Sequence, residues 1–245
     1  MSTDFTLHFD AEGAVLEAAR DCEASVFLEH YGNTAEQWAE EYGPYDPSSA
    51  FIAITDGYGD AVAAMRLILP GPLGLKSLVD VARPPWNVDG ARAARAAGMT
   101  INRTWDVATL AIRTGVRARG LLSAALYHAL FRGTRANGVR WIVMILDLRV
   151  RRLLSGAHID TQVLPGTHTA PYLGSAQSVP LWGEMARMAD RQREINPDAH
   201  RLINLGIGLD GITLPDPAQF VLAKDRPAAD QPALPAILSA GRASA

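Results

Sequence analysis

Two arginines and a glycine, Arg117, Arg119 and Gly120, stand where an apolar helical pattern begins. Over residues 121–130 the apolar side chains recur at the three- and four-residue spacing of an amphipathic helix. The first turn of a helix has N–H groups without intrahelical partners and carries the positive end of the helix dipole. Arginines beside such a turn add positive charge, so this stretch predicts a contact with a phosphate group.

The elements that must position this turn are two strands. Residues 104–112 form a short apolar and β-branched run, and residues 141–146 read as a fully buried strand. Residues 133–138 contain two glycines, which predict the end of the helix that connects these two strands. A strand, a helix and a strand in this order predict a βαβ unit with the arginine-rich turn at the start of its helix.

Residues 117–122 resemble the Arg/Gln-x-x-Gly-x-Gly/Ala loop of the GNAT acyltransferase superfamily, in which the loop holds the pyrophosphate of coenzyme A. Arg117 and Gly120 match the pattern, and Leu122 replaces its final small residue. The resemblance implies an α/β fold with a central mixed, twisted sheet flanked by helices. It also implies that residues of this loop contact the donor's phosphates, namely Arg117, Arg119, Gly120, Leu121 and Leu122.

Three further segments carry a second resemblance. Residues 41–46 keep Glu41, Tyr45 and Asp46 of an acidic-x-acidic-x-aromatic-Asp pattern, and residues 65–70 resemble an Arg-Leu-Leu-Pro strand end with one residue inserted. Residues 105–110 resemble Trp-Glu-x-Ser-Arg-Phe, with Thr109 in place of the arginine. In this order the segments resemble acyl-homoserine-lactone synthases, a GNAT-fold family related in structure to long-chain N-acyl amino acid synthases. Because Gly43 and Thr109 depart from the pattern, the resemblance implies acyl transfer but not lactone formation from S-adenosylmethionine.

Acyl transfer to an amine requires few groups. The attacking amine must be neutral, so a base or an ordered water has to remove its proton. Asp106, on the strand 104–112, is the predicted base, and the alternative is a structural partner for Arg66 or Arg103. Glu41 is the candidate for a second catalytic carboxylate. The candidate substrate-binding residues are Asp46, Arg66, Trp105 and Tyr172. For Glu41 and Asp46 the alternative is a carboxylate that only stabilises a turn.

Strand alternation refines the position of Asp106. Side chains alternate faces along a strand, so Trp105, Val107 and Thr109 are expected on one face and Asp106, Ala108 and Leu110 on the other. The small Ala108 would leave room for a thioester beside the carboxylate. Apolar side chains at Leu67, Leu69, Val143 and Ile145 suggest a donor longer than acetyl, although a plain core predicts the same residues.

Composition narrows the function classes. The chain has 245 residues, 48% hydrophobic and 20% charged, with no apolar run of membrane length and no secretory signal, so we expect a cytoplasmic protein without integral membrane contact. Residues 113–152 contain nine arginines and one acid, Asp147, which fits solvated helix faces or a site for an anionic ligand or an acidic carrier protein. A pI near 6.1 without interleaved aromatic residues disfavours nucleic acid.

Other chemistries are disfavoured by spacing. The single cysteine, Cys22, is expected in the core of the first helix rather than as a nucleophile. His158 and His168 lack the partners of a zinc site, and Ser123 is not in a Gly-x-Ser-x-Gly turn. We therefore expect neither a metal nor a prosthetic group.

The rest of the chain predicts one domain, residues 1–222, followed by an Ala/Pro-rich disordered tail, residues 223–245. The expected helices are 12–30, 34–41 with a cap at Asn33 or Thr34, one or two turns in 73–79, a piece at 91–97 within a long loop, 148–156, 184–193 and 197–205; the further strands are 50–55, 61–69, 159–164 and 178–182.

Together these patterns favour an N-acyltransferase. The donor would be acyl-CoA or an acyl group on the phosphopantetheine of an acyl carrier protein, and the acceptor the amine of a small amino-acid-like molecule. The alternative is a non-catalytic GNAT fold that binds an acyl thioester as a sensor or scaffold.

Overall fold

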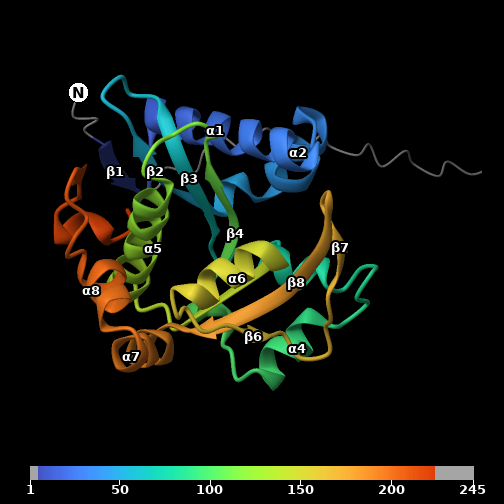
Figure 1. Ribbon diagram of the computed structural model, residues 1–245. Coiled ribbons are helices and arrows are strands. Elements are labelled where there is room, and N and C mark those ends of the chain that lie inside the picture. The colour runs from blue at the N-terminus through green and yellow to red at the C-terminus, as the bar shows by residue number, and fades with distance from the viewer. Residues whose placement is uncertain (1–4, 224–245) are drawn as a thin grey trace, which may run out of the picture.

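A nine-stranded mixed sheet runs through the protein, as the computed structural model of residues 5–223 shows (Figure 1). The strand order is β6-β8-β5-β4-β3-β2-β1-β9, with β7 paired to β8. The strands are β1 (Phe5–Phe9), β2 (Ser49–Thr55), β3 (Ala61–Ile68), β4 (Thr104–Ile112), β5 (Trp141–Asp147), β6 (Gln162–Val163), β7 (Ala170–Tyr172), β8 (Ser175–Glu184) and β9 (Ile212–Thr213).

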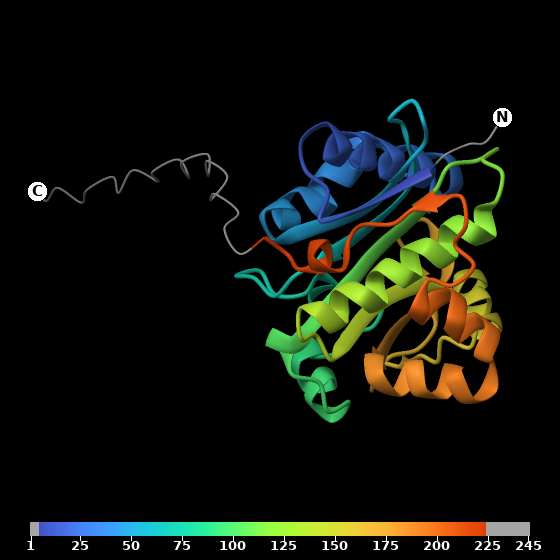
Figure 2. The ribbon, with the colours of Figure 1, turned by 90° about the vertical axis from the view of Figure 1, so that its left-hand side faces the viewer.

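Helices cover both faces of this sheet. The α-helices are α1 (Gly13–Tyr31), α2 (Ala35–Tyr42), α3 (Lys76–Asp80), α4 (Gly90–Ala96), α5 (Arg119–Ala136), α6 (Leu148–Gly156), α7 (Met185–Ile195) and α8 (Pro197–Leu205), with 3₁₀ turns at Gly43–Ser48, Ile101–Arg103 and Pro217–Phe220. Helix α5 crosses the face turned toward the viewer in Figure 2. No helix among residues 5–223 combines the length and the apolar composition that crossing a bilayer requires.

Side-chain alternation along β2 separates the two faces. Ala50, Ile52 and Ile54 pack into the core under α5, whereas Phe51 and Ala53 pack with residues of α1. The α5 face also holds the buried residues of α6, α7 and α8, and the opposite face those of α1, α2, α3 and α4. The predicted mixed sheet flanked by helices is therefore confirmed.

Helix α2 starts at a capping box. The Thr34 hydroxyl accepts a hydrogen bond from the Gln37 N–H at 3.3 Å, and the Gln37 side chain accepts one from the Thr34 N–H at 3.0 Å. This confirms Thr34 as the cap. Four residues apart on this helix, Trp38 and Tyr42 are both buried against the sheet.

Strand β4 contains a bulge at Ala108 that the sequence pattern did not indicate. Arg66 of β3 pairs with Thr109, but the next residue, Leu67, pairs with Val107, so Ala108 is the extra residue. Trp105 and Val107 face α5 as expected, but after the bulge Leu110 packs on that face while the Thr109 hydroxyl bonds to Glu23 of α1. The predicted strict alternation from Trp105 to Leu110 is therefore wrong beyond Ala108.

Strands β4 and β5 pair in parallel over only three residues and then separate. The last partners are Asp106 and Val143. Beyond Val143, β5 stays paired with β8 as far as Asp147, while β4 stays paired with β3 as far as Ile112. The sheet thus opens between its two central strands.

Several boundaries differ from expectation. The strand predicted at 159–164 is reduced to β6, because Ile159 packs into the core beside the end of α6. Strands β1, β7 and β9 were not predicted; β7 and β9 have only three and two residues. The predicted disordered tail lies outside the described residues, apart from Ala223.

Candidate functional site

A cavity of about 620 Å³ occupies the opening between β4 and β5. Its lining includes Ala108, Leu110 and Ile112 of β4 and Ile145 and Asp147 of β5. Further lining residues come from both faces of the sheet: from α5, α6 and α8 on one face (Arg119, Gly120, Ser123, Ala124, Tyr127, Val150, Leu153, Ala157, Ala199, Leu202, Ile203) and from α1, α2 and the β7–β8 hairpin on the other (Val26, Phe27, His30, Tyr31, Tyr42, Tyr172, Leu173, Ser175). The cavity therefore passes through the sheet.

The start of α5 forms one end of this cavity. Ala118 precedes the helix with a φ of 64°, and both Arg119 and Gly120 line the cavity. The Arg119 guanidinium lies 3.5 Å from the carbonyl oxygen of Ile112. Arg117 is exposed two residues earlier, so two arginines and the first N–H groups of α5 lie together at this end.

The two leucines of the predicted phosphate loop are placed differently. The N–H groups of Leu121 and Leu122 both donate to the carbonyl oxygen of Ala118, at 2.8 and 3.1 Å. Leu122 is fully buried in the core, and Leu121 packs against it. Of the predicted loop residues, the structure brings Arg119 and Gly120 to the cavity wall.

Strand β4 presents backbone donors to the cavity. Alternate N–H groups along a strand point to opposite neighbours, and the Arg113 N–H donates to Val62 of β3 at 3.0 Å. The N–H groups of Leu110 and Ile112 therefore point away from β3, toward the gap that β5 has left. Such donors are suited to an oxygen that gains negative charge during a reaction.

An apolar pocket of about 40 Å³ adjoins the cavity under β4 and β5. The two share Thr109, Leu110, Tyr127, Leu146 and Val150. The remaining lining of the pocket is core, including Met144, Phe131 and Met188. The cavity thus borders a small apolar space, large enough for about one methylene group.

Asp106, the predicted base, is enclosed on the α3 side of the sheet. Its carboxylate accepts hydrogen bonds from the Ser77 N–H and, at 2.8 Å, from the Ser77 hydroxyl. Burial raises the pKa of Asp106 to about 7, although both bonds from Ser77 act in the opposite direction. The side chain is fully buried and is not among the cavity-lining residues. Its partner is thus Ser77, not Arg66 or Arg103, and its role as a base stays a prediction.

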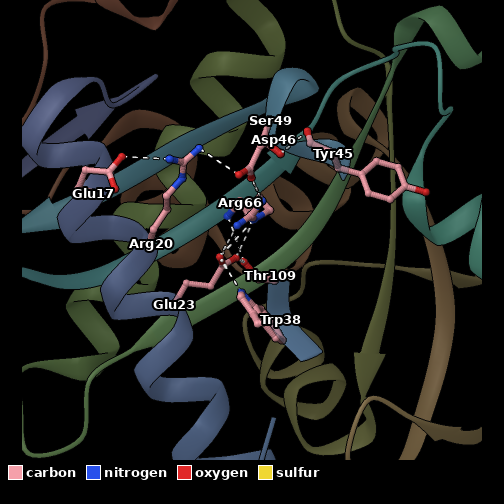
Figure 3. A network of polar contacts seen from close by, with 9 residues as sticks. All are labelled: Glu17, Arg20, Glu23, Trp38, Tyr45, Asp46, Ser49, Arg66 and Thr109. Carbon is pink, nitrogen blue, oxygen red and sulfur yellow. Dashed lines mark hydrogen bonds and ion pairs between the residues drawn. The ribbon is translucent and has the colours of Figure 1, made fainter. Parts of the chain in front are cut away.

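A network of buried charges surrounds Arg66 of β3 (Figure 3). Its guanidinium bonds to Glu23 of α1, at 2.7 Å for the shortest contact, and to Asp46 at 2.7 Å. Glu23 also accepts hydrogen bonds from Thr109 and, at 3.1 Å, from the Trp38 indole. Burial opposes the charge of Arg66, but the carboxylates outweigh it, so the pKa of the guanidinium lies above its ordinary value. We refer to these residues as the Arg66 cluster.

Lys76 of α3 organises a second group beside the cavity. Its ammonium lies 2.7 Å from a carboxylate oxygen of Glu41 and 2.6 Å from one of Asp80. It also donates to the Tyr172 hydroxyl at 3.3 Å, and that hydroxyl donates to Asp80. Burial, followed by Tyr42 and Asp80, raises the pKa of Tyr172 well above its ordinary value, so this phenol stays protonated.

The structure thus separates the sequence candidates. Tyr172 lines the cavity, whereas Glu41, Asp46 and Arg66 are engaged in ion pairs beside it. Trp105 is buried on the α5 face, with its ring 6.5 Å from that of Phe9. Several residues of these arrangements were not proposed as site residues from the sequence, among them Glu23 and Lys76 in the ion pairs and Asp147 and Ser175 on the cavity wall.

No protein-family model matches the sequence, and a search of curated protein sequences found no significant match. Solved structures do resemble it. FeeM, an N-acyl amino acid synthase from uncultured soil microbes, has a TM-score of 0.58 at 12% identity, covering 78% of this chain and 95% of that one.

Two lactone synthases are similar to a comparable degree. The AHL synthase LasI has a TM-score of 0.55 at 14% identity, covering 80% of this chain and 96% of its own. BjaI, a CoA-dependent acyl-homoserine lactone synthase, has a TM-score of 0.56 at 13% identity, covering 87% and 93%. At these identities the likeness shows the fold alone: the chain has the GNAT-type fold that these synthases share.

Proposed function

We propose that this protein is an N-acyltransferase that moves an acyl group from a thioester of coenzyme A or of an acyl carrier protein to the amine of a small molecule. The observation that carries the proposal is the cavity through the sheet, with donors for phosphate at one end and backbone N–H groups in its middle. The similarity of the fold to FeeM, LasI and BjaI supports the same reaction class.

The donor would enter from the α5 face. Its phosphates would lie against the first turn of α5, where Arg119 and Arg117 supply charge-assisted hydrogen bonds. The pantetheine arm would follow β4 in the gap that β5 leaves. The thioester carbonyl would then accept a hydrogen bond from the Leu110 N–H, which stabilises the developing oxyanion.

The acyl chain would extend toward the apolar pocket under β4 and β5. Three of the five residues that the cavity and the pocket share, Leu110, Leu146 and Val150, are aliphatic, and the other two are Thr109 and Tyr127. Each buried methylene contributes about 0.8 kcal/mol. We therefore expect a donor longer than acetyl.

In the reaction, the amine nitrogen attacks the thioester carbonyl, the C–N bond forms and the C–S bond breaks. The sulfur leaves as a thiolate, and the nitrogen loses its excess protons to a base or to water. Asp106 could take a proton only by a path past Ser77, which occupies its carboxylate. The acceptor would be amino-acid-like, in keeping with the activity of FeeM as an N-acyl amino acid synthase.

The test is thiol release. Purified protein is incubated with octanoyl-CoA, acetyl-CoA or an octanoyl carrier protein and a panel of primary amines, and free thiol is followed with a chromogenic disulfide. We expect amine-dependent release that is faster with an octanoyl donor than with acetyl-CoA. Octanoyl-CoA binding without thiol release for any amine would instead favour the non-catalytic sensor or scaffold.

A further inference from the structure

One carboxylate, that of Asp147, lines the cavity among the residues that the structure describes. Asp147 is the last residue of β5 and precedes α6, where it accepts a hydrogen bond from the Arg149 N–H at 2.7 Å. Its second oxygen accepts one from the buried Ser175 hydroxyl, also at 2.7 Å. A carboxylate has about four acceptor sites, so two bonds leave it able to accept more.

The side chain of Asp147 lies on the face opposite α5. Alternation along β5 puts it on the same face as Val143 and Ile145, which pack with residues of α3 and α4. Tyr31 at the end of α1 is close enough that the charge of Asp147, after burial, raises the pKa of its phenol. This carboxylate therefore faces the part of the cavity that the donor's phosphates do not reach.

Three other carboxylates near this part of the cavity are already occupied. Glu41 is paired with Lys76, and Asp46 with Arg66 and Arg20. Asp106 is enclosed with Ser77. None of the three lines the cavity, so none of them offers its charge to a molecule inside it.

Arg149, beside Asp147, is close enough to Tyr31 that its charge acts to lower the pKa of that phenol, but it is exposed and does not line the cavity, so positive charge is scarce among the lining residues on this side. Lys76 and Arg66 are held in ion pairs and do not line the cavity. The lining arginine, Arg119, belongs to the opposite face, which leaves His30 as the lining residue with a basic ring on the α1 side. The remaining walls there are aromatic, with Phe27, Tyr31, Tyr42 and Tyr172, and an ammonium is attracted to such ring faces.

We propose that Asp147 binds the ammonium group of the acceptor, and that among amino-acid-like amines the acceptor is one whose carboxyl group is absent or blocked, unlike the free amino acid that the name of FeeM indicates. A free carboxylate next to the amine would meet the charge of Asp147 without a fixed cation to balance it. The assignment deepens the proposed acyl transfer and rests on it. The bound ammonium releases a proton to water before attack, and the overall reaction of ammonium and thioester yields amide, free thiol and one proton.

The test compares three acceptors that differ at one position: phenethylamine, phenylalaninamide and phenylalanine. With octanoyl-CoA as donor, we expect the first two to be acylated at least tenfold more efficiently, in kcat/KM, than phenylalanine. Equal or better use of phenylalanine would overturn the proposal.

The variant is Asp147→Asn, whose amide oxygen keeps the helix cap and whose amide nitrogen donates to the Ser175 hydroxyl oxygen in place of the bond now accepted, while the charge is removed. A charged hydrogen bond lost in this way should raise the KM for phenethylamine by about 10- to 100-fold, with octanoyl-CoA affinity and kcat little changed. Asp89→Asn is the matched control, because Asp89 caps α4 in the same manner, through the Arg92 N–H at 2.9 Å, and does not line the cavity. An unchanged KM in Asp147→Asn would contradict the assignment; if this variant does not fold, Asp147→Ser keeps a capping side chain and is measured instead.

Calorimetric titration with phenethylamine separates this assignment from the proposed function. If the protein releases no thiol with any amine, the proposed transfer fails, while binding of phenethylamine that is lost in Asp147→Asn would still support Asp147. Binding of equal strength to both proteins would count against Asp147, whatever the activity.

Discussion

The Arg66 cluster and the cavity wall are both rich in chemistry-bearing residues, but their charges are balanced differently. In the Arg66 cluster each charged side chain faces an opposite charge, as Arg66 does with Glu23 and Asp46. On the cavity wall, Arg119 bonds to a backbone carbonyl and Asp147 to a hydroxyl and an N–H. In the first arrangement every charged side chain is paired, with Asp46 also bound to Arg20, whereas the second leaves a charge for a ligand. Residue type alone does not distinguish them, because the partners decide which charge is available.

The comparison predicts that the Arg66 cluster governs stability. Glu23→Ala leaves the Arg66 guanidinium with one partner and removes the acceptor of Thr109 and Trp38. Removing one member of a buried ion pair costs about 3–5 kcal/mol, and we expect a loss of this size in the free energy of unfolding, measured by urea titration.

Glu17→Ala is the control for this variant. Glu17 pairs with Arg20 at 3.0 Å, but its side chain is 68% exposed, so its loss should cost less than about 1 kcal/mol. Equal effects of the two variants would show that the cluster is not the stabilising centre that its burial indicates.

Asp106 should make a smaller contribution, to the pH dependence of the free energy of unfolding. It is buried like the Arg66 cluster, but its partner is neutral. Because its pKa is raised to about 7 in the folded state, the folded protein keeps this proton to higher pH than the unfolded chain does. The free energy of unfolding should therefore fall as the pH rises from about 4 to 7, by on the order of 3 kcal/mol, and then level off.

Asp106→Asn should flatten this part of the pH profile, since the amide does not titrate. Denaturant unfolding of both proteins at pH 4.5 and pH 7.5 gives the difference. The same variant examines its predicted role as a base: a fall of about 10²-fold or more in kcat/KM would support it. Activity and pH–rate profile equal to those of the unchanged protein would assign Asp106 to structure alone.

On the cavity wall we expect changes in binding with little change in stability. The double variant Arg117→Ala, Arg119→Ala should weaken octanoyl-CoA binding by about 10- to 100-fold and make it less sensitive to salt. Arg135→Ala, on the exposed last turn of the same helix, is the control. Calorimetry at two salt concentrations measures both effects. An unchanged affinity in the double variant would contradict the proposed position of the donor phosphates at this end of the cavity.

The smallest predicted effect concerns the acyl chain. Val150→Phe places a larger side chain where the cavity meets the apolar pocket, so it should reduce kcat/KM for octanoyl-CoA relative to acetyl-CoA by about tenfold. Val163→Phe, at an exposed position of β6 outside the cavity, serves as the control. If Val150→Phe keeps the same preference between octanoyl-CoA and acetyl-CoA, the acyl chain does not lie beside Val150.

The sequence predicts the β4–α5–β5 unit well because each of its parts is long and strongly patterned. It does not reveal the bulge at Ala108, since the bulge depends on how β4 pairs with β3 and not on its own composition. The short strands β7 and β9 could not be predicted for the same reason, because they form only by pairing with β8 and β1.

The placement of the candidate site residues follows the same line. Arg119 and Gly120, which a local motif singles out, line the cavity, and so does Tyr172, which was proposed from the sequence as a substrate-binding residue. Asp147 is visible in the sequence as the lone acid in an arginine-rich segment, but its place in the cavity depends on β8 bringing Ser175 beside it, 28 residues away in sequence. Likewise, only the packing of α1 on β3 reveals that Glu23 neutralises Arg66.

The passage of the cavity through the sheet has a consequence for the order of events during turnover. Exposed lining residues lie on both faces, Arg119 on one and His30 on the other, so in the proposed transfer the two substrates would enter from opposite faces. Neither molecule would then have to depart before the other arrives, and both would meet at the Leu110 N–H. Double-reciprocal plots of initial rate against donor concentration, at several fixed amine concentrations, should therefore intersect, as for a ternary complex. The acyl group should pass directly from sulfur to nitrogen, without a covalent acyl-protein intermediate.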